Sequence, residues 1–119
     1  YKTCIFTNDN DATHFGAFYK KKLIGIVSYF HQSQLDYSNP NSWRIRGMAT
    51  LEEYRNKGIG RALINDGREF VKNNRGEIIW CNARESAVFF YKKCGFIIIS
   101  EKFDIDNIGP HYVMIDKLS

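Results

Sequence analysis

The chain has 119 residues, of which 44% are hydrophobic and 25% charged, so its length fits one compact domain with a core and its composition excludes disorder. No apolar run reaches the roughly 18 residues that a membrane span needs, and no secretory leader is recognisable, so we expect a cytoplasmic protein without a membrane partner. The formal net charge of +4 fits a nucleic acid, a membrane surface or a phosphate-bearing small molecule, so the position of the charges has to decide.

Antiparallel strands are predicted for the first third of the chain, because aromatic and β-branched runs alternate there with short polar breaks. The expected strands cover residues 2–6, 12–19 and 23–30, with turns at 8–11 and 20–22. A loop follows over 31–42, and a fourth strand is expected over 43–50. Gly47 lies inside this fourth strand, where it indicates a β-bulge or a close backbone approach.

A helical period begins at Ile59, since apolar residues recur from there on one helical face until about residues 73–76. Gly67 interrupts that face at a cost of about 1 kcal/mol, so packing must stabilise the helix. This segment also holds the charge: residues 55–75 contain six basic and two acidic side chains, an excess equal to the whole net charge. A solvated helix face would look the same. No nucleic-acid recognition motif accompanies it, so we expect no nucleic-acid partner.

A short buried strand is predicted over 77–81, and Asn82 is expected to cap a second helix, with Glu85 three residues further on. Gly95 ends that helix as a left-handed cap would. Two further strands are expected over 96–103 and 111–118. The order therefore predicts an α/β (α+β) fold, with a mixed, mostly antiparallel sheet and a central parallel β-α-β crossover.

The three cysteines, Cys4, Cys81 and Cys94, are odd in number and form no C-x-x-C pair. Neither a disulfide framework nor a zinc site is indicated, and we expect no metal. Each cysteine lies beside apolar or strand-like residues. The favoured interpretation for each is a buried, inert thiol in a reducing compartment.

Two glycines, Gly58 and Gly60, lie where a strand passes into the first helix. They leave backbone N–H groups open at the positive end of the helix dipole, which suits a pyrophosphate. Arg55, Lys57 and Arg61 add positive charge around this loop. The two other glycine-rich phosphate motifs are excluded, because the last glycine of G-x-G-x-x-G is replaced by a leucine and no G-K-[ST] follows.

The loop resembles the R-x-x-G-x-G signature of the GNAT acetyltransferase superfamily, with Arg55, Gly58 and Gly60 at its fixed points. Residues 82–96 are similar to the second helix of that family, with its A-x-x-F-Y-x-x-x-G-F ending. Two motifs in the family's order are more specific than one. The resemblance implies a single GNAT-like domain over residues 1–119, with two splayed parallel strands. The strand and two helices with which family members usually begin are not recognisable before Ile59, so we expect that either they precede Tyr1 or this form is trimmed, and the acceptor cannot be read from the sequence.

The resemblance further implies an N-acetyltransferase that uses acetyl-coenzyme A, without a metal, to acetylate a primary amine on a small molecule or peptide. Tyr91 matches the family's general acid, which protonates the coenzyme A thiolate; from the residues alone, it could equally be a core aromatic. The implied cofactor contacts are Met48, Ala49, Thr50, Arg55, Asn56, Lys57, Gly58, Ile59, Gly60, Arg61, Asn82 and Arg84. Acetyl is favoured over longer acyl groups because it is commonest in the family, and a homodimer is compatible with the family.

The sequence departs from the family at two places. Arg84 stands where many relatives carry an Asn, so Arg84 either reaches a phosphate or leaves the amide contact to Asn82. Residues 43–50 hold no acidic side chain to act as general base. The alternatives are a water chain, one of the acidic pair at 52–53 just beyond the strand, expected to face solvent, or a histidine, His31 or His111. A non-catalytic acyl-coenzyme-A sensor or interaction module is therefore the alternative function.

Overall fold

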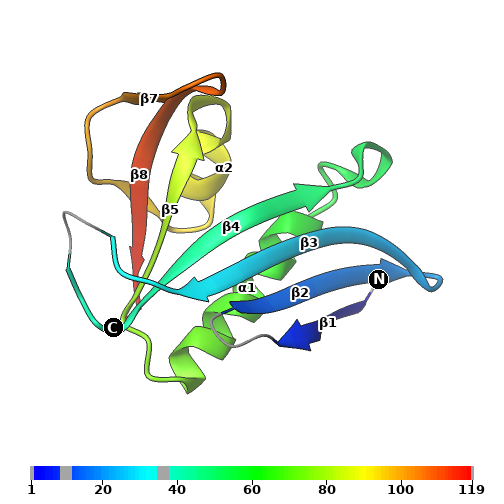
Figure 1. The fold of residues 1–119 in the computed structure, drawn as a ribbon. Helices are drawn as coiled ribbons and strands as arrows, with labels where there is room; N and C mark the ends of the chain where they lie inside the picture. The colour runs from blue at the N-terminus through cyan, green and yellow to red at the C-terminus, as the bar shows by residue number, and fades with distance from the viewer. Residues whose placement is uncertain (1, 9–11, 35–37, 119) are drawn as a thin grey trace.

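The computed structural model describes residues 2–8, 12–34 and 38–118, and its strands form one mixed sheet (Figure 1). The strands are β1 (Lys2–Asn8), β2 (Ala12–Tyr19), β3 (Lys22–His31), β4 (Ser42–Thr50), β5 (Ile78–Arg84), β6 (Ile97–Ile98), β7 (Phe103–Ile105) and β8 (Gly109–Lys117). The helices are α1 (Ile59–Asn73) and α2 (Val88–Lys93), with the 3-10 turns η1 (Glu52–Tyr54) and η2 (Glu85–Ala87). The sheet order is β1-β2-β3-β4-β5-β8-β6, with β7 beside β8.

The predicted fold class is confirmed, and its central feature is the divergence of β4 from β5. These two strands are the one parallel pair in the described sheet, and they pair over three residues only, Ser42 to Arg44 against Ile78 to Trp80. Beyond Arg44 the strands separate, which Figure 1 shows as a V that opens toward the end of each strand. All other pairings are antiparallel. The sheet therefore consists of two halves that are joined where β4 and β5 pair, and we call the region between their diverging ends the gap.

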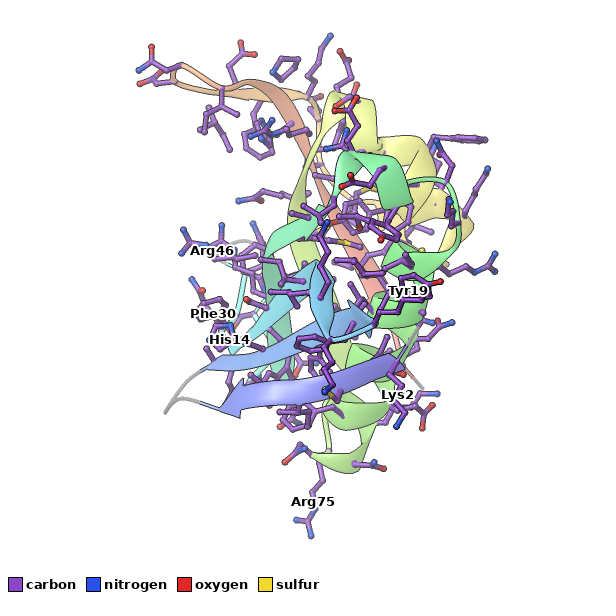
Figure 2. The ribbon with its side chains drawn as sticks, turned by 90° about the vertical axis from the view of Figure 1, so that its right-hand side faces the viewer. Lys2, His14, Tyr19, Phe30, Arg46 and Arg75 are labelled. Atoms are coloured by element: carbon purple, nitrogen blue, oxygen red, sulfur yellow. The ribbon has the colours of Figure 1, made fainter. Side chains whose placement is uncertain are left out.

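Both helices lie on one face of the sheet, as the turned view in Figure 2 shows. The main core lies on this face, where α1 packs against β1 to β4 and α2 packs against β5. A smaller cluster of Ile78, Trp80, Val113 and Ile115, with Phe103 against it, lies on the other face of β5 and β8. In the same view Arg46, Phe30 and His14 point away from the helices.

The bulge expected at Gly47 is confirmed. Ile26 pairs with Ala49 and Ser28 pairs with Arg46, so Gly47 and Met48 together face one residue of β3. Gly47 has a φ of 70°, a left-handed conformation that glycine adopts at little cost. The bulge bends β4 just before the strand leaves its partner, and it interrupts the ladder beside Met48.

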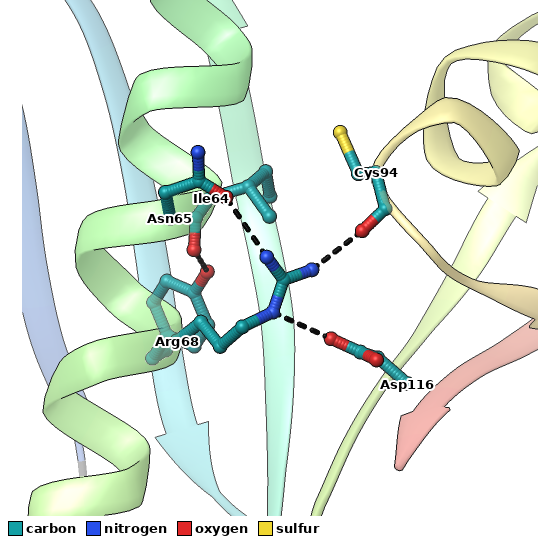
Figure 3. A network of polar contacts seen from close by, with 6 residues as sticks. Ile64, Asn65, Arg68, Cys94 and Asp116 are labelled. Atoms are coloured by element: carbon teal, nitrogen blue, oxygen red, sulfur yellow. Dashed lines mark hydrogen bonds and ion pairs between the residues drawn. The ribbon is translucent and has the colours of Figure 1, made fainter. Parts of the chain in front are cut away.

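A polar network joins the two halves behind the gap (Figure 3). Arg68 on α1 donates from Nε to Asp116 of β8 at 2.8 Å and from a terminal nitrogen to the Cys94 carbonyl at 2.5 Å. Its other terminal nitrogen donates to Asn65 at 2.8 Å. The guanidinium thereby connects the helix of the first half with the last strand and the second helix of the other half.

Three sequence-based predictions were wrong in detail. Asn82 is no helix cap, because β5 continues to Arg84 and pairs with β8 as far as His111, and this ladder takes the backbone that a cap would use. The strand predicted over 96–103 is broken into β6 and β7. Between them the Val113 N–H donates to the Ser100 hydroxyl at 2.8 Å in place of a ladder carbonyl.

The third error concerns the thiols. Cys4 is exposed on the edge strand β1, whereas Cys81 and Cys94 are buried as expected.

The predicted turn at 8–11 lies mostly outside the described residues. Gly95 follows α2 with a φ of 101°, as a C-terminal glycine cap requires. The helix predicted from Ile59 is also confirmed, since α1 runs from Ile59 to Asn73.

Gly67 is expected to be intolerant of any side chain. A Cβ there would lie 2.0 Å from a ring carbon of Tyr29, a fully buried residue whose hydroxyl donates to the Ile64 carbonyl at 3.2 Å. We expect Gly67→Ala to lower the free energy of unfolding by about 2 kcal/mol in urea titrations, because overpacking outweighs the helix propensity gained. In a Tyr29→Leu background the same change is expected to be neutral or stabilising. Equal losses in both backgrounds would contradict the steric explanation.

Candidate active site

The glycine loop carries α1 out of the end of β4. Gly58 precedes the helix with a φ of 82°, and a Cβ on it would meet no atom within 4 Å. Asn56 is also left-handed, with a φ of 63°. The loop residues 55–58 are exposed, so the first turn of α1 presents its N-terminal end to open space. This geometry suits an anion at the helix N-terminus.

Three cations of the loop surround this turn. Arg55 is exposed and donates from Nε to the Thr50 carbonyl at 3.2 Å, which ties the loop back to the end of β4. The Lys57 ammonium lies 6.0 Å from the ring centre of Tyr54. Arg61 is exposed on the first turn of α1. Positive charge therefore lies on both sides of the glycines.

Gly60 brings three elements together. A Cβ on this residue would lie 2.9 Å from the Met48 methyl of β4 and 3.2 Å from the Phe90 ring of α2. The first turn of α1, the free end of β4 and the second helix thus meet at one point. The close approach of these side chains, and not a positive φ, favours a glycine here.

Tyr91 faces the gap from α2. Its side chain is 8% exposed, packs edge-on against Phe90 and Phe96, and places its hydroxyl 3.8 Å from the Met48 sulfur. Burial raises the pKa of Tyr91, and the neighbouring thiols Cys81 and Cys94 raise it further. The phenol therefore stays protonated well beyond neutral pH, as a proton donor must.

Cys81 on β5 has a buried thiol that acts on Tyr91. Burial raises the pKa of Cys81 to about 12, although the Arg44 guanidinium acts in the opposite direction. A sulfur anion in an equally buried place would be disfavoured for the same reason, and a neighbouring proton donor would stabilise it.

The remaining predicted cofactor residues lie on both sides of the gap. Met48, Ala49 and Thr50 form the last three positions of β4, where no β4–β5 pair is formed in the described sheet. Asn82 and Arg84 lie at the end of β5, on the opposite side. Ile59 is buried, whereas its loop neighbours are exposed.

The candidate bases are spread around the molecule. Glu52 and Glu53 are exposed on η1, as predicted. His31 stacks on Trp43 at 4.9 Å and contacts the Pro40 carbonyl at 3.0 Å, at the closed end of the gap. His111 is buried and donates from Nδ1 to the Gly109 carbonyl at 2.8 Å. None of the described strands β2 to β5 carries a carboxylate.

Two functionally relevant features were missed from the sequence. One is the Arg68 network, and the other is a pair of arginines, Arg44 and Arg46, on the helix-free face. The alternation of these arginines with Trp43 and Ile45 is a period-2 signal that could have placed both on one face. Among the described residues, no group of His, Cys, Asp or Glu could hold a metal, and no helix could span a membrane.

The splayed pair, the glycine loop and the single helix-bearing face define the fold of the GNAT acyl-coenzyme-A N-acyltransferases. Comparison with known proteins agrees: the profile described as "Acetyltransferase (GNAT) family" matches residues 1–96. The chain belongs to this family.

Curated relatives are similar over most of the chain. The chain is 40% identical over 117 residues to "Uncharacterized N-acetyltransferase YitI" of Bacillus subtilis, covering 97% of this chain and 78% of that protein. It is 32% identical to "Uncharacterized N-acetyltransferase ABC2369" of Shouchella clausii, covering 80% of this chain and 57% of that protein. The chain thus spans between about half and four fifths of the length of these relatives.

Solved structures show the same fold at low identity. An aminoglycoside 6'-N-acetyltransferase complexed with coenzyme A superposes with a TM-score of 0.79 at 16% identity, over 93% of this chain and 75% of that one. The PaiA N-acetyltransferase of Thermoplasma acidophilum, also in complex with coenzyme A, gives 0.71 at 22%, over 90% and 61%. At these identities the likeness establishes the fold alone.

Proposed function

We propose that this chain transfers an acetyl group from acetyl-coenzyme A to a primary amine. The observation that carries the proposal is the juxtaposition of an open helix N-terminus, a strand end that is paired with β3 but not with β5, and a buried tyrosine around Gly60. The helix end suits a diphosphate, and the unpaired edge of β4 suits an amide-bearing arm that binds as an added strand. Two solved structures of the same fold are complexes with coenzyme A, which supports this ligand.

The proposed reaction is a direct transfer. The amine nitrogen attacks the thioester carbonyl, and a C–N bond forms as the C–S bond breaks. The bulge at Gly47 interrupts the ladder beside Met48, so a backbone N–H there can stabilise the developing oxyanion. Tyr91 donates its proton to the leaving thiolate and regains one from solvent, while the ammonium releases its extra proton to water.

A non-catalytic acyl-coenzyme-A-binding module is the second candidate, and the lack of a carboxylate on β2 to β5 favours it. Thiol release from acetyl-coenzyme A in the presence of an amine panel, with mass-spectrometric identification of acetylated products, separates the two functions. Binding without thiol release would support the module. Calorimetry without heat at millimolar coenzyme A would overturn both.

The Gly60→Ala variant tests the coenzyme A site. The added methyl group displaces the flexible end of Met48 toward the gap, and we expect the affinity for coenzyme A to fall about tenfold by calorimetry. The Gly60→Ala/Met48→Ala double variant removes the obstruction and is expected to regain most of the affinity. Unchanged binding in the single variant would place the arm elsewhere.

A further inference from the structure

The helix-free face of β2 to β5 carries an arginine pair at the point where the gap opens. Arg44 is the last β4 residue paired with β5, and Arg46 follows two positions later on the same face. The Arg44 guanidinium lies 4.8 Å above the Trp80 ring, and that of Arg46 lies 5.9 Å from the Phe30 ring. Figure 2 shows Arg46 beside Phe30 and His14, away from both helices.

The pair lacks a counterion among the described residues. Strands β2 to β5 hold no Asp or Glu, and neither arginine forms an ion pair within residues 2–8, 12–34 and 38–118. His14, across β3 in the same row as Arg46, bonds the Ser28 hydroxyl at 2.7 Å. In the described strands, this face thus combines two cations and aromatic rings without a carboxylate.

Arg44 carries a second, independent signal. Its Nε is buried, and no hydrogen-bond acceptor reaches it from the described part of the chain. A buried donor without a partner is costly and calls for a ligand or ion to satisfy it. Burial lowers the pKa of Arg44, and the adjacent Arg46 lowers it further, so an anion here would relieve both effects.

The position of the pair matches the approach of an acceptor. α1 and α2 occupy one face of the gap, which leaves the helix-free face for an incoming amine. Along β4, at roughly 3.3 Å per residue, Arg46 lies about 7 Å and Arg44 about 13 Å before Met48. An amine at the thioester could therefore place a group several bonds away against them.

We infer that Arg44 and Arg46 select acceptors that carry an anionic group, a carboxylate or a phosphate, several bonds from the reactive amine. This rests on the proposed function. A guanidinium group that lies beside an aromatic ring can still donate two parallel N–H bonds to a carboxylate or phosphate. A polycationic acceptor would be repelled by the same pair.

The test is a matched acceptor series with saturating acetyl-coenzyme A: ε-aminocaproate, its amide, aminopentylphosphonate and cadaverine. We expect kcat/KM for both anionic acceptors to exceed that of the amide at least tenfold, with cadaverine lowest. Arg46→Gln and Arg44→Gln are expected to bring the ratio of carboxylate to amide close to 1. Arg75→Gln, on an exposed residue beyond α1, is expected to keep the wild-type ratio. A preference for the carboxylate alone or the phosphonate alone identifies the anion.

A binding measurement separates this inference from the proposed function. The Arg44 Nε–H resonance of the coenzyme-A-bound protein is expected to shift with ε-aminocaproate and not with its amide, and the shift requires no chemistry. If that resonance responds but no amine is acetylated, the proposed function fails and the anion site stands. If neither anionic acceptor reacts faster than the amide in the wild type, or if the resonance is unmoved by both anionic acceptors, the anion site is overturned. A ratio that survives both arginine substitutions overturns it as well.

Discussion

Tyr91→Phe is expected to lower kcat for acetyl transfer about 100-fold, the smaller end of what a general acid contributes. The reason is desolvation: a thiolate that leaves beside the buried Tyr91 side chain would be poorly solvated, and Tyr91 is the donor proposed to protonate it. Phe keeps the edge-on packing against Phe90 and Phe96, so the fold and the affinity for coenzyme A are expected to be retained.

The pH dependence gives this prediction a second readout. The protonated phenol is the active form, and its pKa is raised above the usual value near 10, so wild-type kcat is expected not to fall between about pH 7 and 10 through Tyr91. The Phe variant should show its deficit throughout this range in stopped-flow thiol assays. A variant that matched the wild-type rate at every pH would assign Tyr91 to packing alone.

A thioester with a better leaving group provides the control. If Tyr91 acts by protonating the thiolate, then the transfer from a thioester whose thiol is more acidic should depend less on Tyr91. We therefore expect the ratio of wild-type to variant rates to shrink with an aryl thioester of coenzyme-A-like length. An unchanged ratio would indicate that the substitution disturbs positioning rather than proton transfer.

The sequence predicted those parts of the fold in which local preference and packing agree. The bulge at Gly47 follows from a glycine set in a strand of β-branched and aromatic residues, and Gly95 follows from the helical period that it ends. The prediction that Asn82 caps the second helix was wrong, because the capping preference of Asn competes with the hydrogen bonds between β5 and β8, and the sequence does not show that pairing. The same applies to Ser100, whose side chain replaces a ladder carbonyl and divides β6 from β7.

The motif predicted the glycine loop at the start of α1, whereas the features around this loop were not predicted from the sequence. The divergence of β4 from β5 cannot be read from the sequence, because diverging strands and paired strands show the same alternation of apolar and polar residues. Arg68 was counted with a basic stripe of α1, yet its partner Asp116 lies 48 residues away in sequence. The position of a charge on a helix is visible in a sequence; the group it meets across the fold is not.

Removing Arg68 is expected to destabilise the fold more than any other single charge change on α1. Arg68→Ala leaves Asp116, 12% exposed, and the Cys94 carbonyl without their donor. We expect about 3 kcal/mol less free energy of unfolding in urea, the lower end of the cost of breaking a buried pair, because the Arg68 side chain keeps 20% exposure. Arg75→Ala, exposed just beyond the same helix, is expected to change it by less than about 0.5 kcal/mol.

A double-mutant cycle distinguishes this pair from general damage to α1. With Asp116 already replaced by Ala, the further loss of Arg68 should cost at least 1 kcal/mol less than it does alone, because no unpaired carboxylate remains. Additive losses would show that the contact contributes little. Since β4 and β5 pair over only three residues, this network also sets how far α2 and Tyr91 stand from the glycine loop of α1. Folded Arg68→Ala should therefore lose kcat/KM as well, because a displacement of about 1 Å between anchor and reacting atoms can cost roughly 100-fold.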